Sequence, residues 1–131
     1  MTPVEIGTLA HETVEELLNQ KEEKTMASFI TGSRAYGKPT LNSDTDLVVR
    51  VTPEEANILV LCADQDGKPT YEGADTMALR FGNLNLICCM TAESYDQWKR
   101  GTTILKQLAP VERSLAMAVF KQIREVARNA H

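Results

Sequence analysis

The sequence predicts one α+β domain, in which helices pack on a small mixed β-sheet. The chain has 131 residues, a length that fits a single domain with one modest core. Apolar residues recur at helical spacing in some segments and form short strand-like runs in others. The two kinds of segment occur in mixed order, as expected of a sheet covered by helices. We expect the core at residues 1–90 and a C-terminal helical part at 91–131.

The first half of the chain predicts two strands between helices. Thr2-Pro3 supplies a cap and a helix-starting proline. The helix that follows has an apolar face that continues to Leu18. Strand-like runs are expected at about 26–31 and 44–51. A capping box with proline at the first helical position, Thr52–Glu55, then opens a helix to about residue 63.

The second half predicts a hairpin and two helices. Two strand-like runs, 77–81 and 84–89, flank Gly82-Asn83, a pair typical of a two-residue hairpin loop. Thr91 caps the next helix, whose aromatic residues Tyr95 and Trp98 we interpret as core rather than base-stacking residues. Pro110 starts the last helix. Its apolar face is expected to contain Leu115, Val119, Phe120, Ile123, Val126 and Ala127.

Composition restricts the classes of function. The net charge is −4, the isoelectric point is about 5.2 and aromatic residues make up 5%. These values disfavour a long nucleic-acid interface and a wall of stacking side chains. Acidic residues concentrate in 1–24 and basic residues in 97–131. We interpret both runs as solvated helix faces, with a phosphate-guiding basic surface as the alternative.

The cysteines and histidines predict no metal centre and no disulfide. Cys62, Cys88 and Cys89 have neither zinc spacing nor an easy disulfide geometry, so we expect reduced, buried thiols. His11 and His131 are expected to be solvated. Neither a signal peptide nor an apolar run long enough to cross a bilayer is recognised, so we expect a cytoplasmic protein without membrane contact.

A cluster of polar residues links the first two strands. In the stretch GSRAYGKPTLNSDTD, Asp44 and Asp46 share one face of the second strand, and the apolar residues between and after them share the other. Two ionised carboxylates this close repel each other unless a cation lies between them. Hard oxygen ligands suit Mg²⁺ or Mn²⁺, with water and phosphate oxygens in the remaining positions.

The other end of this stretch is suited to phosphate. Gly32 lets the backbone approach a ligand closely, and the turn exposes N–H groups at the start of a short helical piece. The Ser33 hydroxyl and the Arg34 guanidinium add hydrogen-bond donors. A phosphate-binding turn beside a metal-binding carboxylate pair is the arrangement that nucleoside triphosphate chemistry requires.

This pattern resembles the DNA polymerase β-type nucleotidyltransferase superfamily. An apolar strand, Gly-Ser, about ten residues and Asp-x-Asp on the next strand are its motif, and GSRAYG…NSDTDLVV is especially similar to minimal bacterial and phage members. The motif covers about residues 28–51, and the element order extends the likeness to residue 90. The resemblance implies helices on one face of the sheet and the carboxylates on the open face.

The pattern departs from the superfamily at the third carboxylate. The matching context, apolar-x-apolar on a later strand, contains Asn85, which can offer a carbonyl to a metal but cannot take a proton. The predicted hairpin register sets Arg80 opposite Asn85. Arg80 then contacts a nucleotide phosphate or substrate acid, or else forms an exposed cross-strand pair or a partner for Asp46. Asp75 and Glu72 are the candidates for a replacement acid.

Two main functions follow from the resemblance. The first is a Mg²⁺- or Mn²⁺-dependent enzyme that transfers a nucleoside monophosphate from a triphosphate such as ATP to a hydroxyl acceptor on a protein, a short RNA or a small molecule. The second is a weakened or inactive member that binds a nucleotide or a protein, as a phage-type regulator or an antitoxin-like partner does. A chain this short is expected to need a partner surface or a second copy of itself.

Overall fold

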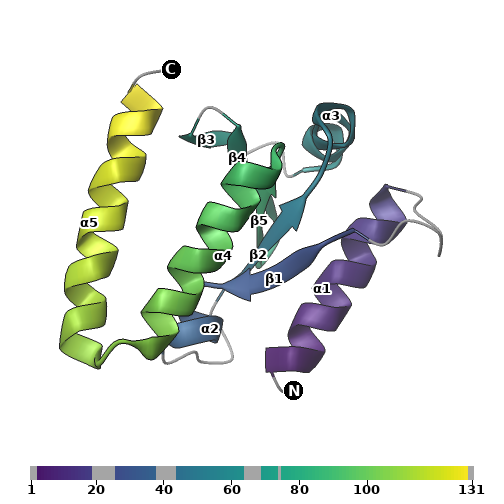
Figure 1. Cartoon of the computed structure of the whole chain (residues 1–131). Helices are drawn as coiled ribbons and strands as arrows, with labels where there is room; N and C mark the ends of the chain where they lie inside the picture. The colour runs from purple at the N-terminus through teal and green to yellow at the C-terminus, as the bar shows by residue number, and fades with distance from the viewer. Residues whose placement is uncertain (1–2, 19–25, 38–43, 64–68, 74, 130–131) are drawn as a thin grey trace.

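The computed structural model describes residues 3–18, 26–37, 44–63, 69–73 and 75–129 (Figure 1). Five strands form one sheet in the order β1-β2-β5-β4-β3. The strands are β1 (Ser28–Thr31), β2 (Thr45–Arg50), β3 (Thr70–Gly73), β4 (Thr76–Phe81) and β5 (Leu84–Cys89). The helices are α1 (Pro3–Leu17), α2 (Ser33–Tyr36), α3 (Pro53–Cys62), α4 (Ala92–Gln107) and α5 (Pro110–Asn129).

The sheet is mixed, which confirms the predicted α+β class. β2 and β5 pair in parallel, whereas β1–β2, β4–β5 and β3–β4 pair antiparallel. The hairpin register is also confirmed, because Phe81 pairs with Leu84 and Arg80 with Asn85. β3 is not predicted by the sequence pattern. This strand is four residues long and lies at the edge of the sheet, and its pairing with β4 is a tertiary contact that local alternation does not reveal.

One face of the sheet forms the main core. The inward side chains of β2, β4 and β5 are buried together with residues of α1 and α3. The largest of these fully buried side chains are Leu47, Leu59, Leu79, Leu86, Val14, Val49 and Val51. Alternate residues of β2 supply this face, as the period of two in the sequence predicted. The capping box of α3 is confirmed, since the Thr52 hydroxyl accepts from the Glu55 amide and the Glu55 carboxylate accepts from the Thr52 amide.

The second face of the sheet is not open along its whole length. Val48, Ile87 and Cys89 are buried on it, with Phe29, Tyr95 and Trp98 packed against them. Tyr95 and Trp98 come from α4, so the expectation that helices lie on one face only is wrong for α4. The physical reason is that β2 and β5 present apolar residues on both faces, and these need cover. The core role predicted for the two aromatic residues is confirmed. The rings of Phe29 and Tyr95 pack edge to face, with 5.3 Å between their centroids.

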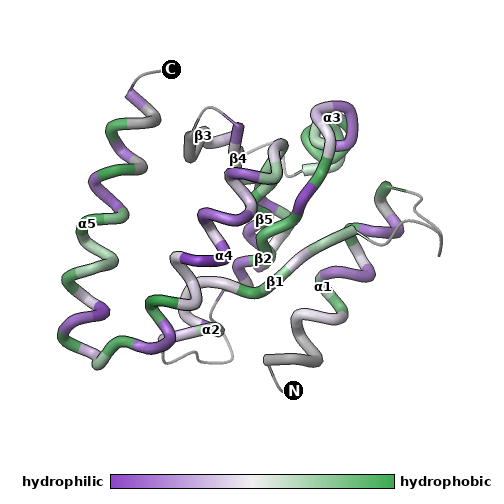
Figure 2. The backbone as a smooth tube through the Cα atoms, viewed as in Figure 1, coloured by the Kyte–Doolittle hydropathy of each residue, from purple (hydrophilic) through white to green (hydrophobic). Residues whose placement is uncertain are grey.

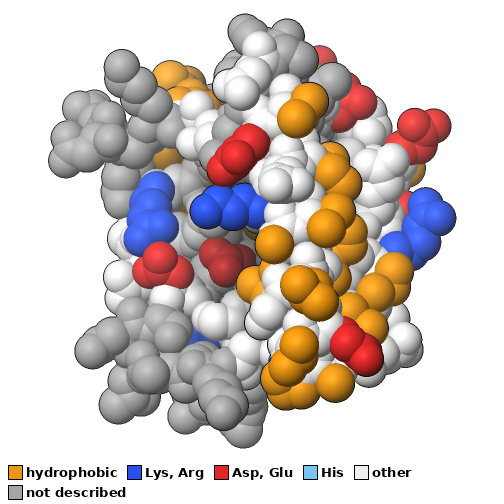
Figure 3. Space-filling model, turned by 90° about the vertical axis from the view of Figure 1, so that its left-hand side faces the viewer, with side chains coloured by type: hydrophobic (Ala, Val, Ile, Leu, Met, Phe, Trp, Pro, Cys, Tyr) orange, Lys and Arg blue, Asp and Glu red, His pale blue; other side chains and the backbone are white. Residues whose placement is uncertain are grey.

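The last helix, α5, contacts α4 and β3 but leaves most of its apolar residues in solvent. Figure 2 shows hydrophobic residues gathered along β2 and alternating with hydrophilic ones along α5. Figure 3 shows a row of hydrophobic side chains on the side of the molecule where α5 lies. The exposed members are Val111, Leu115, Met117, Val119, Ile123 and Val126. The helix was therefore predicted correctly, and most of the apolar residues placed on one face of it are exposed.

Two expectations about single side chains need correction. Cys88 and Cys89 are buried and free, as expected, but Cys62 is exposed. Burial raises the pKa of Cys88 to about 12 and that of Cys89 to about 11. His11 is half-buried rather than solvated, because it bonds with Ser28 and Glu15, while His131 lies outside the described residues. No helix in the described part of the chain is long and apolar enough to cross a membrane.

Candidate functional site

Three of the polar residues predicted for the site, Asp46, Asn85 and Arg80, form a row with Thr31 across one end of the sheet. Thr31 of β1 pairs with Asp46 of β2, Asp46 with Asn85 of β5, and Asn85 with Arg80 of β4. Directly paired residues of adjacent strands point to the same face of a sheet and lie about 5 Å apart. The row Thr31–Asp46–Asn85–Arg80 therefore brings together side chains that are up to 54 positions apart in the sequence, from 31 to 85.

Asp46 lies at the centre of this row. The Asn85 amide donates a hydrogen bond from Nδ2 to Asp46 Oδ1 at 3.1 Å. The pKa of Asp46 is raised above its usual 3.8. Burial is the largest cause, and the hydrogen bond from Asn85 opposes it. The negative charge of Asp44 raises the pKa further, and the positive charge of Arg80 lowers it. Asp46 is thus a partly desolvated carboxylate that a nearby cation would stabilise in its charged form.

Asp44 lies one residue before β2 and forms an ion pair with Arg80. The distance from Arg80 Nη2 to Asp44 Oδ2 is 2.9 Å, and the two side chains are 46% and 41% exposed. An ion pair this exposed contributes at most about 1 kcal/mol to stability, so a ligand can displace it at low cost. Arg80 forms the expected exposed cross-strand pair with Asn85, and its acidic partner is Asp44 rather than Asp46.

Gly32 joins the phosphate-suited turn to the carboxylates. Its backbone has φ 71° and ψ −156°, a conformation that essentially only glycine adopts. A Cβ at this position would lie 2.0 Å from Asp46 Oδ2 and 2.9 Å from its Cγ. The backbone of the turn therefore lies directly against the Asp46 carboxylate. Gly32 and Asp46, which lie in the two halves of the motif, are therefore in direct contact.

Ser33 and Arg34 follow in α2, but they take different positions. α2 is a single turn, in which the Gly32 carbonyl accepts from the amides of Ala35 and Tyr36. So short a helix offers a ligand a few amide groups rather than a helix dipole. Arg34 lines a cavity bounded by α1, β1 and α4, to which neither Asp44 nor Asp46 contributes. The structure thus brings Gly32 to the acids and assigns Arg34 to a separate cavity.

Neither candidate for a replacement acid lies near the row. Asp75 immediately precedes β4 and is exposed, and its carbonyl accepts from the Met90 amide, beyond the end of β5. It is five residues from Arg80, or roughly 16 Å along a strand. Glu72 lies in β3 between residues that pair with Met77 and Thr76, at that same far end, and its side chain lies outside the described residues. Asp75 is therefore excluded as the third carboxylate of this arrangement.

The donor set nevertheless fits a hard divalent cation for which the protein supplies only some of the ligands, with water and phosphate oxygens as the others. Among the described residues, no group of three or more His, Cys, Asp or Glu side chains could hold a metal. Two carboxylates and the amide oxygen of Asn85, after rotation of its side chain, are available at one end of the sheet. Mg²⁺ is commonly held by one or two carboxylates, with water and substrate phosphates as its other ligands. Residues 38–43, which lead into Asp44, lie outside the described chain.

Thr31, the residue that ends the row at β1, is not among the site residues predicted from the sequence. The hydroxyls of Thr31 and Thr102 of α4 lie 2.7 Å apart, and both residues are 4% exposed. This buried contact joins α4 to the sheet directly beside Asp46. Thr31 is a polar residue at the C-terminal end of β1, which is only weak evidence in the sequence for a role in the site. Its partner is 71 residues away, so only the folded arrangement identifies the pair.

Comparison with known proteins gives a fold neighbour and no family. No protein-family model matches the chain, and no curated protein matches it. The crystal structure of the conserved protein GrpB from Enterococcus faecalis is similar, with a TM-score of 0.51 and 16% sequence identity. The likeness covers 98% of this chain and 93% of that chain. At this identity it shows a common fold and no activity. None of the comparisons names a nucleotidyltransferase.

Proposed function

We propose that this protein binds a nucleoside triphosphate together with Mg²⁺ or Mn²⁺ and transfers its nucleoside monophosphate to a hydroxyl acceptor. The observation that supports this best is the contact between Gly32 and Asp46, since a Cβ on Gly32 would lie 2.0 Å from the carboxylate. Accidental occurrence of Gly-Ser and Asp-x-Asp in one loop would not require the two to touch. Their contact supports a single site in which phosphate and metal share a boundary.

In this proposal each residue has a distinct task. Asp44 and Asp46 hold the metal, and Asn85 supplies its amide oxygen when the side chain turns away from Asp46. The amides of the Gly32-Ser33 turn and the Ser33 hydroxyl bind phosphate oxygens. Arg80, released from Asp44, neutralises a phosphate. The bound metal supplies positive charge to the triphosphate and to the leaving pyrophosphate.

The transfer step follows from this arrangement. The acceptor oxygen attacks the α-phosphorus, and the bond from that phosphorus to the bridging oxygen breaks. Pyrophosphate leaves with the electron pair. The acceptor proton goes to solvent water or to Asp46, because an amide at Asn85 cannot accept it. Replacing a carboxylate base by an amide lowers such rates by roughly 10²–10⁴-fold, so we expect slow turnover.

A second function, nucleotide binding without turnover, is favoured by the contacts of Asn85 and Arg80. The Asn85 amide donates to Asp46 at 3.1 Å, and Arg80 pairs with Asp44 at 2.9 Å. In these contacts both Asp46 and Asp44 have protein partners. An active enzyme would leave the two carboxylates available to bind the metal. Under this function the chain is a regulator or an antitoxin-like partner that binds a nucleotide or a protein.

The test is transfer of label from α-³²P-labelled ATP, GTP, CTP and UTP with Mg²⁺ or Mn²⁺, with pyrophosphate release followed in parallel. Acceptors are the protein itself, short RNA and small hydroxyl compounds. The proposal expects slow release that Asp46→Ala abolishes, whereas the control Asp96→Ala, an exposed carboxylate on α4, leaves it intact. Absence of both transfer and pyrophosphate with all four triphosphates rejects the enzyme.

The variant Asn85→Asp separates the two functions. If the wild type turns over slowly, restoring a carboxylate beside Asp46 should increase the rate, by up to about 10²-fold. A wild type that binds triphosphate without turnover, and gains activity in Asn85→Asp, is a weakened member of the fold. Binding in both proteins with turnover in neither supports the binding module.

A further inference from the structure

A separate cavity lies at the edge strand β1, beside the row Thr31–Asp46–Asn85–Arg80. A cavity of about 620 Å³ opens there, with walls from α1, β1, α2 and α4. This volume lies within the range of small-molecule sites. The buried hydroxyl pair of Thr31 and Thr102 stands between the cavity and Asp46. The cavity is therefore a neighbour of the row and not an extension of it.

The α4 wall of the cavity is one face of a helix with a cation at each end. Lys99, Thr102, Thr103 and Lys106 all line it, at the spacing i, i+3, i+4 and i+7 that sets residues on one side of a helix. Among the described residues, neither lysine forms an ion pair. Arg34 approaches from α2 and lines the same space. No acidic side chain of the described chain is among the lining residues, whereas two lysines and one arginine are.

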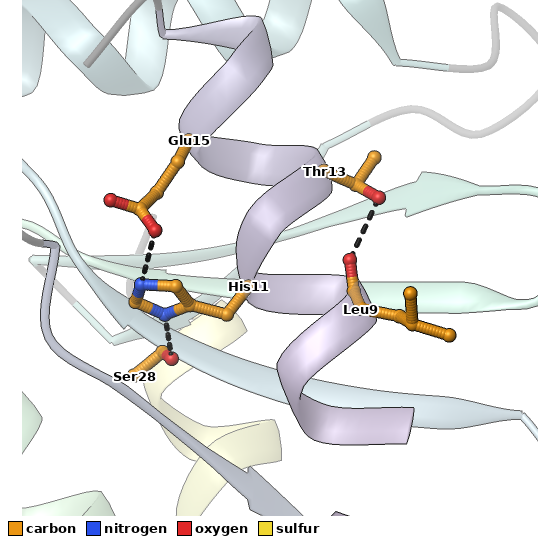
Figure 4. Close-up of polar contacts among 5 residues, drawn as sticks. All are labelled: Leu9, His11, Thr13, Glu15 and Ser28. Carbon is orange, nitrogen blue, oxygen red and sulfur yellow. Dashed lines mark hydrogen bonds and ion pairs between the residues drawn. The ribbon is translucent and has the colours of Figure 1, made fainter. Parts of the chain in front are cut away.

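The α1 wall adds oriented polar groups. His11 lines the cavity, and its ring is fixed on both sides, by the Ser28 hydroxyl at Nδ1 and by Glu15 Oε1, 2.7 Å from Nε2 (Figure 4). Figure 4 also shows the hydroxyl of Thr13, which donates to the carbonyl of Leu9 on the same helix at 2.8 Å. α1 can lie this close to β1 because Gly7 has no side chain; a Cβ there would lie 3.0 Å from Ile30.

The remaining walls are apolar. Phe29, Ile30, Ala35 and Leu47 all line the cavity. A purely inorganic anion would leave these walls in contact with water, whereas an apolar or aromatic group attached to the anion would cover them. Cations and hydrophobic side chains that line one cavity are the combination that an organic phosphate requires.

We propose that this cavity binds a phosphate monoester with an apolar or aromatic group. Lys99 and Lys106 hold the phosphate at the wall that Arg34 completes, and Phe29 and Ile30 contact the organic part. The site needs neither the metal nor Asp46. It goes beyond nucleotidyl transfer, since its ligand binds beside the row of acids and not within it.

The test is an NMR titration of the full chain with phenyl phosphate and with inorganic phosphate, in EDTA so that no metal is present. We expect phenyl phosphate to shift the amide signals of Thr8, Ser28 and Thr103, and to bind at least about threefold tighter than inorganic phosphate, because its ring covers apolar surface. The double variant Lys99→Gln/Lys106→Gln should weaken binding by roughly tenfold, through loss of two charge-assisted contacts. Circular dichroism verifies that the variant is folded.

Two matched controls make the result specific. Arg100→Gln/Lys121→Gln removes the same charge from residues that do not line this cavity, and Asp46→Asn alters the row of acids only. Both should bind phenyl phosphate within about twofold of the wild type. The proposal is overturned if wild-type binding does not saturate, if inorganic phosphate binds as tightly, or if either control loses as much affinity as the lysine variant. Because the assay contains no metal or triphosphate, its failure leaves the proposed transfer reaction untouched.

Discussion

At the scale of single residues, the site depends on how closely the Gly32 backbone lies to the Asp46 carboxylate. The glycine is needed for two separate reasons. Its φ of 71° is a backbone conformation that other residues rarely adopt, and a Cβ would clash with Asp46 Oδ2 at 2.0 Å. The second reason distinguishes this glycine from others in turns. Gly82, in the β4–β5 hairpin, also has a positive φ, of 58°, but a Cβ there would have no neighbour within 4 Å.

The variant Gly32→Ala tests this contact, with Gly82→Ala as its control. Gly82→Ala should cost about 1–2 kcal/mol in unfolding free energy, the usual penalty of a left-handed backbone. Gly32→Ala should cost clearly more, because the methyl group must also displace Asp46 or the turn. Urea unfolding of both variants measures the difference. Equal costs would show that Gly32 does not lie against Asp46.

The Asp46 carboxylate itself should reduce stability at neutral pH. Its pKa is raised above 3.8 in the folded state, so folding favours the protonated form. The charged form therefore costs stability above the folded-state pKa, and that cost disappears as the pH falls through this pKa towards 3.8. Asp46→Asn should be more stable than the wild type at pH 7, by at most about 1 kcal/mol because solvent screens a partly exposed group.

Thermal unfolding of the two proteins between pH 7 and pH 3.5 measures this effect as a difference, which cancels the titration of the other acids. The advantage of Asp46→Asn should shrink as the pH falls. Asp96→Asn, at an exposed position of α4, should show no advantage at either end. A variant that is less stable than the wild type at pH 7 would contradict the assigned burial of Asp46.

At the scale of secondary-structure elements, one arginine joins three helices. Arg113 of α5 donates from Nε to the carbonyl of Leu105 at 2.8 Å and from Nη2 to that of Leu108 at 2.9 Å. Its Nη1 donates to the carbonyl of Tyr36, at the end of α2. The last carbonyls of a helix have no partner within it, and Arg113 satisfies two at the end of α4. The basic run of the sequence was interpreted as a solvated face, and Arg113 is an exception to it.

Arg113→Ala should therefore destabilise the protein by about 2 kcal/mol, since several charge-assisted hydrogen bonds are lost and part-buried carbonyls remain. Arg100→Ala is the matched control, because its Nε lies 3.5 Å from a carbonyl of its own helix and the side chain is exposed. That change should cost less than about 0.5 kcal/mol. Chemical unfolding gives both values, and hydrogen exchange should show faster opening of α5 in Arg113→Ala alone. No difference between the variants would contradict the role of Arg113.

At the scale of the whole molecule, local patterns predicted the elements and tertiary contacts decided the rest. The hairpin register followed from Gly82-Asn83 and was sufficient to set Arg80 opposite Asn85. The same parity predicted which face of β2 is core. Three features depend on contacts between distant segments, which no local period encodes. They are the pairing of β3, the packing of α4 on the sheet and the exposure of α5.

The candidate site was predictable to a similar extent. Asp44, Asp46, Asn85 and Arg80 were all named from the motif and from strand parity, and the structure brings them to one end of the sheet. The separation of Arg34 from these acids was not predictable, because its direction depends on how the one-turn helix α2 lies against α4 and β1. The Thr31–Thr102 pair was hidden for the same reason, since its halves come from β1 and α4.

The most direct measurement of the central claim locates the metal. Substoichiometric Mn²⁺ with ATP should broaden NMR signals of groups close to the bound ion. We predict that the amides of Gly32, Asp46 and Asn85 broaden first, while Asp75, roughly 16 Å away along β4, stays sharper. Asp46→Asn should remove the selective broadening. Two results would contradict a metal–nucleotide site at the row Thr31–Asp46–Asn85–Arg80. One is selective broadening at Asp75 or at the acidic face of α1, and the other is broadening that Asp46→Asn leaves unchanged.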